Sequence, residues 1–152
     1  MGQGYRIDVF NNTSRTLSIS PGASGSMNAN GLPSHQLQPG QWLGTFNNPA
    51  NQPYYVELGG ETGFITIDVD VTNVGSGSFV LQFDADSLQN YPGSAFFTLP
   101  NGVSPIKVTD GSTTSWIYAT VYLAIFGPWT EAVVVLVEAF GAQGAIVPPY
   151  QV

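Results

Sequence analysis

The chain has 152 residues, of which 43% are hydrophobic and 12% aromatic, enough for one folded domain with its own core. Only 9% are charged, and ten acidic residues against three basic ones give a net charge of −7. Arg6, Arg15 and Lys107 are too few to contact the phosphates of a nucleic acid or to attach the chain to anionic lipid as a polybasic patch. The sequence contains no cysteine, which excludes disulfides, thiolate nucleophiles and cysteine-based metal sites.

The N-terminal residues run Met-Gly-Gln-Gly-Tyr-Arg-Ile-Asp, without the apolar core region of a signal peptide, and lead directly into a strand pattern. Arg6 stands where a myristoylation motif requires Ser or Thr. We therefore expect synthesis in the cytoplasm and leave non-classical release open, so the final compartment stays undetermined.

Glycine (18 residues) and proline (11) punctuate the chain, and β-branched and aromatic runs fill the intervals, as is typical of a sandwich or barrel. The pattern predicts an all-β fold, an antiparallel β-sandwich of about ten short strands in a single domain spanning residues 1–152. The predicted strands cover residues 4–10, 15–20, 36–46, 53–58, 64–73, 77–84, 94–99, 105–109, 115–126 and 131–140.

The clearest predicted hairpin is central. Apolar residues alternate with polar ones from Ile65 to Val71, and again from Phe79 to Phe83, so each strand has one buried face. The turn is expected within residues 73–77.

Two Asp-x-Asp pairs, Asp68 with Asp70 and Asp84 with Asp86, place carboxylates on the wet strand faces, roughly 7 Å apart within a pair. In the hairpin we expect the first pair near Gln82 and Asp84. Clustered carboxylates suit calcium, and two carboxylates at such a separation also serve glycosidases. No calcium-loop motif surrounds them, so a solvated sheet face is the leading interpretation and calcium binding the alternative.

Two C-terminal stretches, 116–126 and 132–137, are apolar at both odd and even positions. A membrane-spanning helix needs about 20 uninterrupted apolar residues, and Gly127-Pro128 and Glu131 break the run. We therefore expect two strands whose second face is covered by another copy of the chain. Either Val133, Val135 and Val137, or Val134 and Leu136, would form that homo-oligomer contact.

No catalytic arrangement is found in the sequence. His35 is the single histidine, and its neighbour Ser34 would point to the other side of an extended segment, so the two do not form a dyad. One histidine without cysteine also makes a zinc site unexpected. We expect a protein that is not an enzyme and has no cofactor.

Several aromatic residues fall in or beside predicted loops, where amphipathic rings suit a membrane interface or the face of a sugar. The alternative is that each ring covers an end of the sandwich. The candidate ligand- or membrane-binding residues are Trp42, Tyr54, Tyr55, Tyr91 and Trp129.

Three segments resemble the aegerolysins, small β-sandwich proteins of fungi and bacteria that include the smaller partner of a binary insecticidal crystal toxin. These segments are residues 6–17 (RIDVFNNTSRTL), 60–67 (GETGFITI) and 77–84 (GSFVLQFD) with the following loop through Tyr91-Pro92-Gly93. The resemblance spans about the first 95 residues and departs from the family pattern between Trp116 and Phe140. It implies recognition of a membrane lipid, often a sphingolipid, and pore formation with a larger protein partner. No binding residue of the family is carried over.

The expected function is therefore that of a non-catalytic, membrane-lipid-binding, cytolysin- or toxin-like protein. A lectin-like carbohydrate-binding protein is the main alternative, since it would also use loop Trp and Tyr with Asn and Asp. A self-assembling structural protein, with the apolar C-terminal strands at subunit contacts, is the second alternative.

Overall fold

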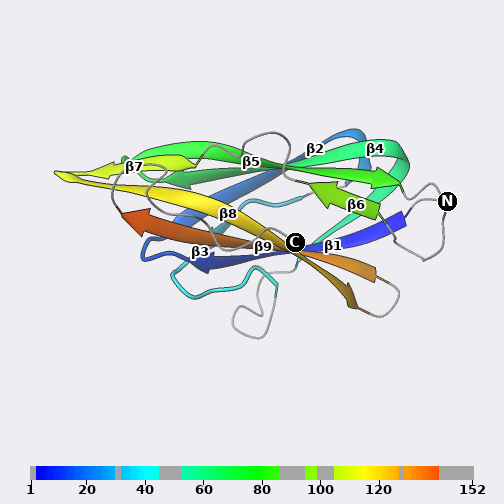
Figure 1. The fold of residues 1–152 in the computed structure, drawn as a ribbon, viewed down its shortest axis with the longest axis horizontal. Helices are drawn as coiled ribbons and strands as arrows, with labels where there is room; N and C mark the ends of the chain where they lie inside the picture. The colour runs from blue at the N-terminus through cyan, green and yellow to red at the C-terminus, as the bar shows by residue number, and fades with distance from the viewer. Residues whose placement is uncertain are drawn as a thin grey trace.

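The structure is a computed structural model that describes residues 3–29, 32–44, 53–85, 95–98, 105–126 and 129–140. Within these ranges the chain is all-β and contains no helix, which confirms the predicted class. Figure 1 shows the strands. They are β1 (Gln3–Asn12), β2 (Leu17–Asn28), β3 (His35–Leu37), β4 (Tyr54–Val71), β5 (Gly75–Ala85), β6 (Ala95–Thr98), β7 (Ile106–Asp110), β8 (Thr113–Phe126) and β9 (Trp129–Phe140).

The strands differ from the prediction in number and in pairing. The two segments predicted at 53–58 and 64–73 form one long strand, β4. Of the predicted strand 36–46, the described residues 36–44 contribute the end of the short strand β3, which ends at Leu37, and an isolated bridge at Trp42. Hydrogen bonds join the described strands into one mixed sheet, because β1 and β9 run parallel. The expectation of wholly antiparallel pairing was therefore wrong for this pair, which brings together two segments more than 100 residues apart in the chain.

The sheet turns back on itself because β4 belongs to two sides of it. Residues 54–58 of β4 pair with β1, whereas residues 62–71 pair with β5, and β2 follows both parts. The register of β2 shifts between Gly25 and Met27, and Gly25 has a φ of 64°. A side chain at Gly63 would come within 2.8 Å of the Met27 backbone nitrogen, so this bend needs a glycine there.

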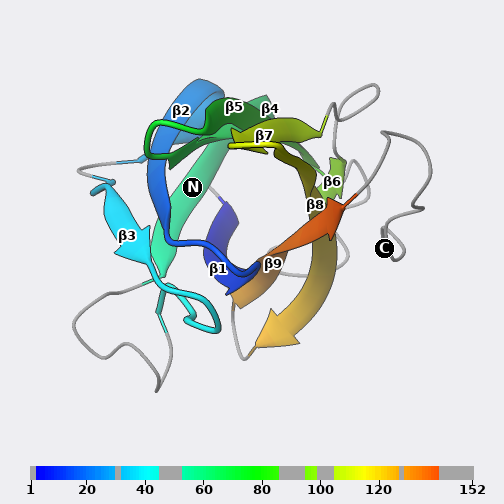
Figure 2. The ribbon, with the colours of Figure 1, turned by 90° about the vertical axis from the view of Figure 1, so that its left-hand side faces the viewer.

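Figure 2 looks along the long axis and shows the strands curling around a common centre. We call β2, β5 and residues 62–71 of β4 the first wall, and β1, β8, β9 and residues 54–58 of β4 the second wall. The order of the main path is β3-β2-β4-β1-β9-β8-β7, with β5 on β4 and β6 on β5.

Both walls send their alternate apolar residues into one core. The hairpin of β4 and β5 buries the face predicted from its alternation, and across the core the ring of Tyr5 lies 5.0 Å from that of Phe83. Burial raises the pKa of Tyr5 to about 12. Fully burying one Val, Leu, Ile or Phe side chain of this core stabilises the fold by about 1.5–3 kcal/mol. The core includes Leu17, Ile19, Ile65, Ile67, Val69, Phe79, Leu81 and Phe83 of the first wall and Ile7, Val9, Ile117, Ala119, Val121, Ala132, Val134 and Leu136 of the second.

The two walls also meet where the start of β5 packs against β7, the strand that pairs with β8 of the second wall. The backbone nitrogen of Thr109 donates to the carbonyl of Val74 (2.9 Å), just after the β4–β5 turn. A side chain at Gly75 would overlap the carbonyl oxygen of Lys107, and one at Gly77 would come within 2.7 Å of Ile106. The two glycines therefore permit the close approach that closes this side of the sheet.

Replacing Gly75 by alanine should destabilise the fold by about 1–3 kcal/mol, because a methyl group must displace the β7 backbone. Gly22→Ala is the matched control: Gly22 lies in β2 with open space around it and should tolerate the methyl group with little change. Urea unfolding monitored by tryptophan fluorescence measures both variants. Equal stabilities for the two would show that β7 does not pack against β5 in this way.

A buried polar cluster holds the turn between β1 and β2. The side chain of Asn11 is fully buried, and its amide nitrogen donates to the carbonyls of Arg15 (2.8 Å) and Leu37 (2.9 Å). Its oxygen accepts hydrogen bonds from the backbone nitrogen and the hydroxyl of Thr13. The turn after β1 is therefore a structural element that ties β1 to β3.

Glu138 of β9 lies beside this turn and accepts hydrogen bonds from the Ser115 hydroxyl (2.6 Å), the Ser14 hydroxyl (2.7 Å) and Arg15 Nε (2.9 Å). Burial alone would raise the pKa of Glu138, but these hydrogen bonds outweigh it and hold the pKa at about 2. Because the pKa lies below its ordinary value of 4.5, the stabilisation is present above that value and is lost as the pH falls toward 2.

Glu138→Gln should therefore cost up to roughly 3 kcal/mol of unfolding free energy at neutral pH, and the difference from the wild type should shrink as the pH falls below about 4.5. Glu57→Gln, on an exposed position of β4, is the control and should change stability by less than about 0.5 kcal/mol. Urea unfolding at several pH values tests this. A difference between Glu138→Gln and the wild type that stays constant with pH would contradict it.

Candidate functional site

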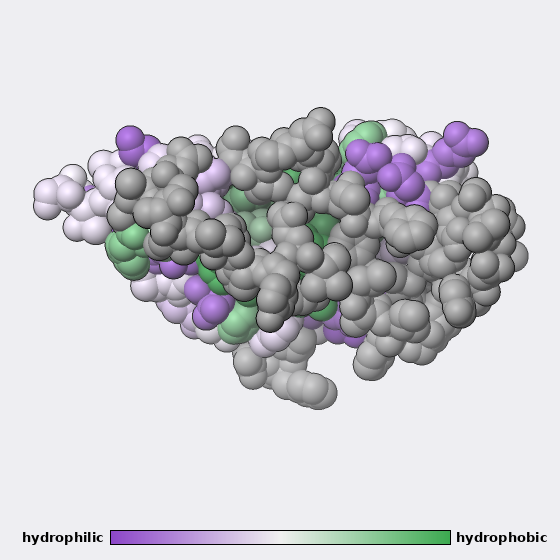
Figure 3. Space-filling model, viewed as in Figure 1, coloured by the Kyte–Doolittle hydropathy of each residue, from purple (hydrophilic) through white to green (hydrophobic). Residues whose placement is uncertain are grey.

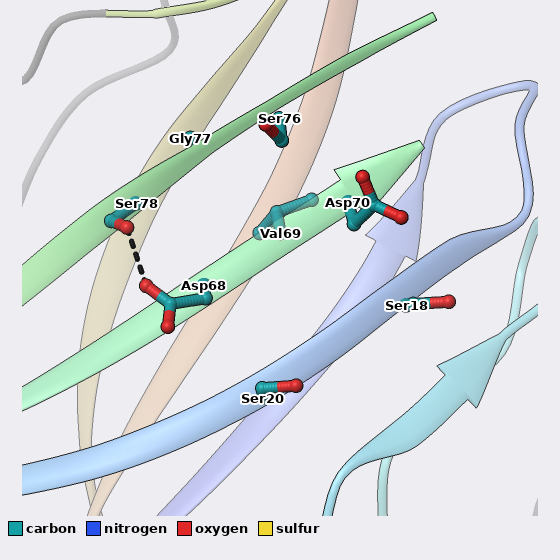
Figure 4. A pocket seen from close by; sticks show the side chains of 8 residues that line it. All are labelled: Ser18, Ser20, Asp68, Val69, Asp70, Ser76, Gly77 and Ser78. Carbon is teal, nitrogen blue, oxygen red and sulfur yellow. Dashed lines mark hydrogen bonds between the residues drawn. The ribbon is translucent and has the colours of Figure 1, made fainter. Parts of the chain in front are cut away.

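The first wall carries an open polar hollow of about 380 Å³ on its outer side. Asp68 and Asp70 of β4 lie at its centre, with serines of β2 on one side and serines of β5 on the other (Figure 4). The register explains the arrangement, since Ser18 and Ser76 flank Asp70 while Ser20 and Ser78 flank Asp68. The hollow is lined by Ser18, Ser20, Asp68, Val69, Asp70, Ser76, Gly77 and Ser78.

This register corrects the predicted neighbourhood of the aspartates. The turn at residues 72–74 pairs Val71 with Gly75, so Asp68 lies opposite Ser78, which donates a hydrogen bond to it. Gln82 and Asp84 lie farther along the hairpin, opposite Phe64 and Thr62, and therefore do not meet Asp68 and Asp70.

Asp84 has partners of its own. It accepts hydrogen bonds from the Thr62 hydroxyl (2.8 Å) and from Gln82 Nε2 (3.0 Å). Asp86 lies outside the described residues. Among the residues described, no group of three histidine, cysteine or acidic side chains comes together that could hold a metal ion.

The hollow offers hydroxyls that donate or accept and carboxylates that accept, the groups with which proteins bind the hydroxyls of polyols. Ser34 and His35 have separate partners: the Ser34 hydroxyl lies 2.9 Å from that of Ser20, which lines the hollow, and the His35 ring stacks 6.2 Å from that of Tyr54.

The two neighbouring tyrosines of β4 point to opposite sides of the sheet. Tyr54 is only 1% exposed, its hydroxyl donates to the Pro33 carbonyl (2.9 Å), and burial raises its pKa. Its ring therefore serves the core, in place of the surface role expected for it. Tyr55 is 48% exposed and lies next to Arg6 of β1.

Trp42 and Tyr55 lie on the same side of the second wall. The Trp42 ring packs on that of Phe10, with centroids 4.6 Å apart, in a short bridge between residue 42 and β1. Alternation along β1 puts Arg6, Asp8 and Phe10 on the outer side, because Ile7 and Val9 face the core. We call this outer surface of β1 and β9, with Trp42 and Tyr55, the aromatic face.

The remaining two aromatic candidates are only partly described. Trp129 begins β9 and pairs with Phe126 at the end of the β8–β9 hairpin. Tyr91 lies outside the described residues. Phe10 was not among the candidates named from the sequence. Because neighbouring residues of a strand face opposite sides, a core position for Val9 would have placed Phe10 on the outer side.

The β9 valines resolve into two rows. Val134 and Leu136 belong to the core, whereas Val133, Val135 and Val137 are partly buried on the aromatic face, paired with Asp8, Phe10 and Asn12. Figure 3 shows apolar residues reaching the surface in the middle of the view.

The outer side of β8 behaves differently from that of β9. Tyr118 is 8% exposed and Thr120 is fully buried within a single chain. The expectation that nothing in the chain covers the second face was therefore wrong for this part of β8. The homo-oligomer remains a prediction that depends on Val133, Val135 and Val137 alone.

A group of charges lies within the aromatic face. Arg6 Nη2 is 3.8 Å from Asp8 Oδ2, and Arg6 Nε is 4.0 Å from Glu131 Oε1. Asp8 Oδ1 accepts hydrogen bonds from the backbone nitrogens of Val9 (2.9 Å) and Gly44 (3.1 Å). This group anchors the segment that carries Trp42 to β1.

Comparison with known proteins adds no relative. No protein-family model matches the chain, and neither a curated protein nor a solved structure matches it. In the described part of the chain, no helix has the length and apolar character needed to cross a membrane.

Calcium at about 5 mM, above the Kd of weak extracellular calcium modules, should leave the melting temperature within about 1 °C of that in chelator, because the described carboxylates do not gather into a group that could hold the ion in the native state. The measurement is a thermal melt of the wild type with Asp70→Asn in parallel. A saturable rise in the wild type that is absent in the variant would instead show a calcium site in the hollow.

Proposed function

We propose that this chain is a non-catalytic, membrane-lipid-binding protein of the cytolysin type, similar to the aegerolysins, and that its layering is that of a two-layer β-sandwich. The meeting of both walls in one core, with Tyr5 against Phe83, supports the sandwich. The observation that carries the function is the aromatic face, where Trp42, Tyr55 and Phe10 lie beside the partly buried valines of β9.

The chemistry of this face suits the boundary between headgroups and acyl chains. Amphipathic rings such as Trp and Tyr favour that boundary, and β-branched side chains supply apolar area behind them. Among the described residues of the face, Arg6 is the one cation, and its charge is opposed by Asp8 and Glu131. Attraction to anionic lipid is therefore weak, which favours a lipid with a neutral headgroup.

The resemblance to the aegerolysins suggests a sphingolipid as that lipid and a larger protein partner for pore formation. Both belong to the proposal. The partly buried Val133, Val135 and Val137 are the residues through which copies of the chain would assemble at the membrane.

One observation favours a second candidate, a lectin-like carbohydrate-binding function. The hollow on the first wall brings two carboxylates and four serines to one open surface. Carboxylates and hydroxyls can bind sugar hydroxyls. The aromatic platform common in sugar sites is missing among the residues that line it, which places this candidate second.

Vesicle flotation tests the choice. The wild type should float with vesicles of phosphatidylcholine, sphingomyelin and cholesterol more than with phosphatidylcholine alone. Tyr55→Ser should weaken binding about five- to tenfold, because an exposed ring leaves the interface while the core is unchanged.

The matched control is the double variant Asp70→Asn, Ser76→Ala, which alters the hollow on the other wall and should float like the wild type. Failure of the wild type to float with either vesicle would overturn the membrane function. Glycan-array binding that the hollow variant loses would establish the lectin function instead.

A further inference from the structure

The charged group on the aromatic face contains two carboxylates, Asp8 and Glu131, and one cation, Arg6. Asp8 is fully buried although it points to the outer side of β1, and its Oδ2 atom makes no hydrogen bond within the described structure. Glu131 lies next to Arg6 in the parallel register, with 13% of its side chain exposed. Two carboxylates therefore share one guanidinium in a largely desolvated place.

We propose that Asp8 and Glu131 form a proton-binding site that takes up one proton as the medium becomes mildly acidic, and that this uptake strengthens binding of the aromatic face to membranes. The second part of this proposal rests on the proposed membrane function. The first part concerns the folded chain alone and can be measured without lipid.

The balance of charge is the reason for the uptake. With both carboxylates ionised, the group carries one positive and two negative charges, a net of −1. A buried charge without a full complement of partners is costly, and a buried acid commonly binds a proton instead. One proton makes the group neutral and leaves a single carboxylate for Arg6.

The titratable and charged groups around the Asp8 carboxylate in the neighbouring described elements are few. Arg6 of β1 and Glu131 of β9 lie beside it, and β4 presents Tyr55 opposite Arg6 and the exposed Glu57 two residues farther along the same face. Residues 42–44 contribute only backbone hydrogen bonds, from Leu43 and Gly44, to the carboxylate. Segment 41–53 contains no acidic, basic or histidine residue in its sequence.

The direction of both pKa shifts agrees with the charge count. Burial raises the pKa of Asp8 against the opposing hydrogen bonds from Gly44 and Val9 and the charge of Arg6. Burial also raises the pKa of Glu131, with Arg6 opposing and the charge of Asp8 adding to the rise. Because the two sites interact, the proton belongs to the pair.

The sign of the linkage follows from these directions. A carboxyl whose pKa is raised in the folded state stabilises the fold fully below its ordinary pKa, and this contribution is lost as the pH rises through the raised pKa. The pH dependence that this group gives to stability is therefore opposite in sign to that of Glu138, whose contribution is lost only as the pH falls below about 4.5. The two effects occupy different pH intervals.

Membrane affinity should change with the same proton. Moving the aromatic face toward hydrocarbon carries the charged group into a medium of lower dielectric constant, where a net charge costs more than a neutral group. The protonated form avoids this cost. Binding to uncharged vesicles should therefore increase as the pH falls.

The first experiment measures the melting temperature between about pH 5 and pH 8, the interval above the ordinary carboxyl pKa, for the wild type, Asp8→Asn and Glu131→Gln. The wild type should gain a few degrees toward pH 5. Both variants should lose most of that gain, because each leaves Arg6 with one carboxylate. The amide introduced by Asp8→Asn keeps an oxygen to accept from Gly44, and Glu131→Gln covers the case in which the buried substitution fails to fold.

His35→Gln is the control, since histidine ordinarily titrates in this interval, and it should keep the wild-type response. A response that is unchanged in both carboxyl variants, or that disappears in His35→Gln alone, overturns the proton site.

The second experiment repeats flotation at both ends of the pH interval with vesicles of phosphatidylcholine, sphingomyelin and cholesterol. The wild type should bind about three- to tenfold more tightly at the acid end, a gain of about 1 kcal/mol, and Glu131→Gln should bind equally at both ends. Equal binding of the wild type at both ends overturns the link to the membrane. If the two carboxyl variants lose the pH response of the melting temperature but the wild type does not float with any vesicle, the proton site is supported and the membrane function is overturned. The two failures are therefore distinguishable.

Discussion

The double membership of β4 is the constraint on which the rest of the structure depends. A strand of 18 residues pairs at one end with β1 and at the other with β5, and this continuity requires β2 to shift register where it passes Gly63. A larger residue at 63 would strike Met27 and separate β2 from β4. The curling of the sheet, the shared core and the closure at Gly75 all follow from this bend.

Curling gives the molecule two outer surfaces with different chemistry. The inner rows of both walls must be apolar, but the outer rows are free of that requirement. On the first wall they carry the serines and aspartates of the hollow, and on the second they carry aromatic residues and valines around the charged group of Arg6, Asp8 and Glu131. This asymmetry makes the second wall the better candidate for contact with lipid and the first the better candidate for contact with polar ligands.

Local patterning predicted the parts of the fold that depend on near neighbours. The hairpin of β4 and β5 follows from strict alternation and a short turn, so its buried face was correct. The parallel pairing of β1 with β9 has no local signal, because nothing in either strand identifies the other from the opposite end of the chain. The site depends on this pairing, since it alone places Glu131 beside Arg6. Likewise, alternation separates Tyr54 from Tyr55 but does not say which of the two faces the core until the partner strands are known.

The placement of the cations limits how this protein can recognise a surface. Each of the three positive side chains already has a partner: Arg6 lies between Asp8 and Glu131, Arg15 pairs with Glu138 and Asp110, and the Lys107 nitrogen lies 5.7 Å from the Trp116 ring centroid. With a net charge of −7 over the whole chain, long-range attraction to an anionic membrane or to nucleic acid is not available. In the proposed membrane function, contact would therefore depend on short-range apolar and aromatic groups. For the same reason, the proposed protonation of the Asp8–Glu131 pair should change membrane affinity strongly. No excess of positive charge on the chain outweighs the loss of one negative charge from the aromatic face.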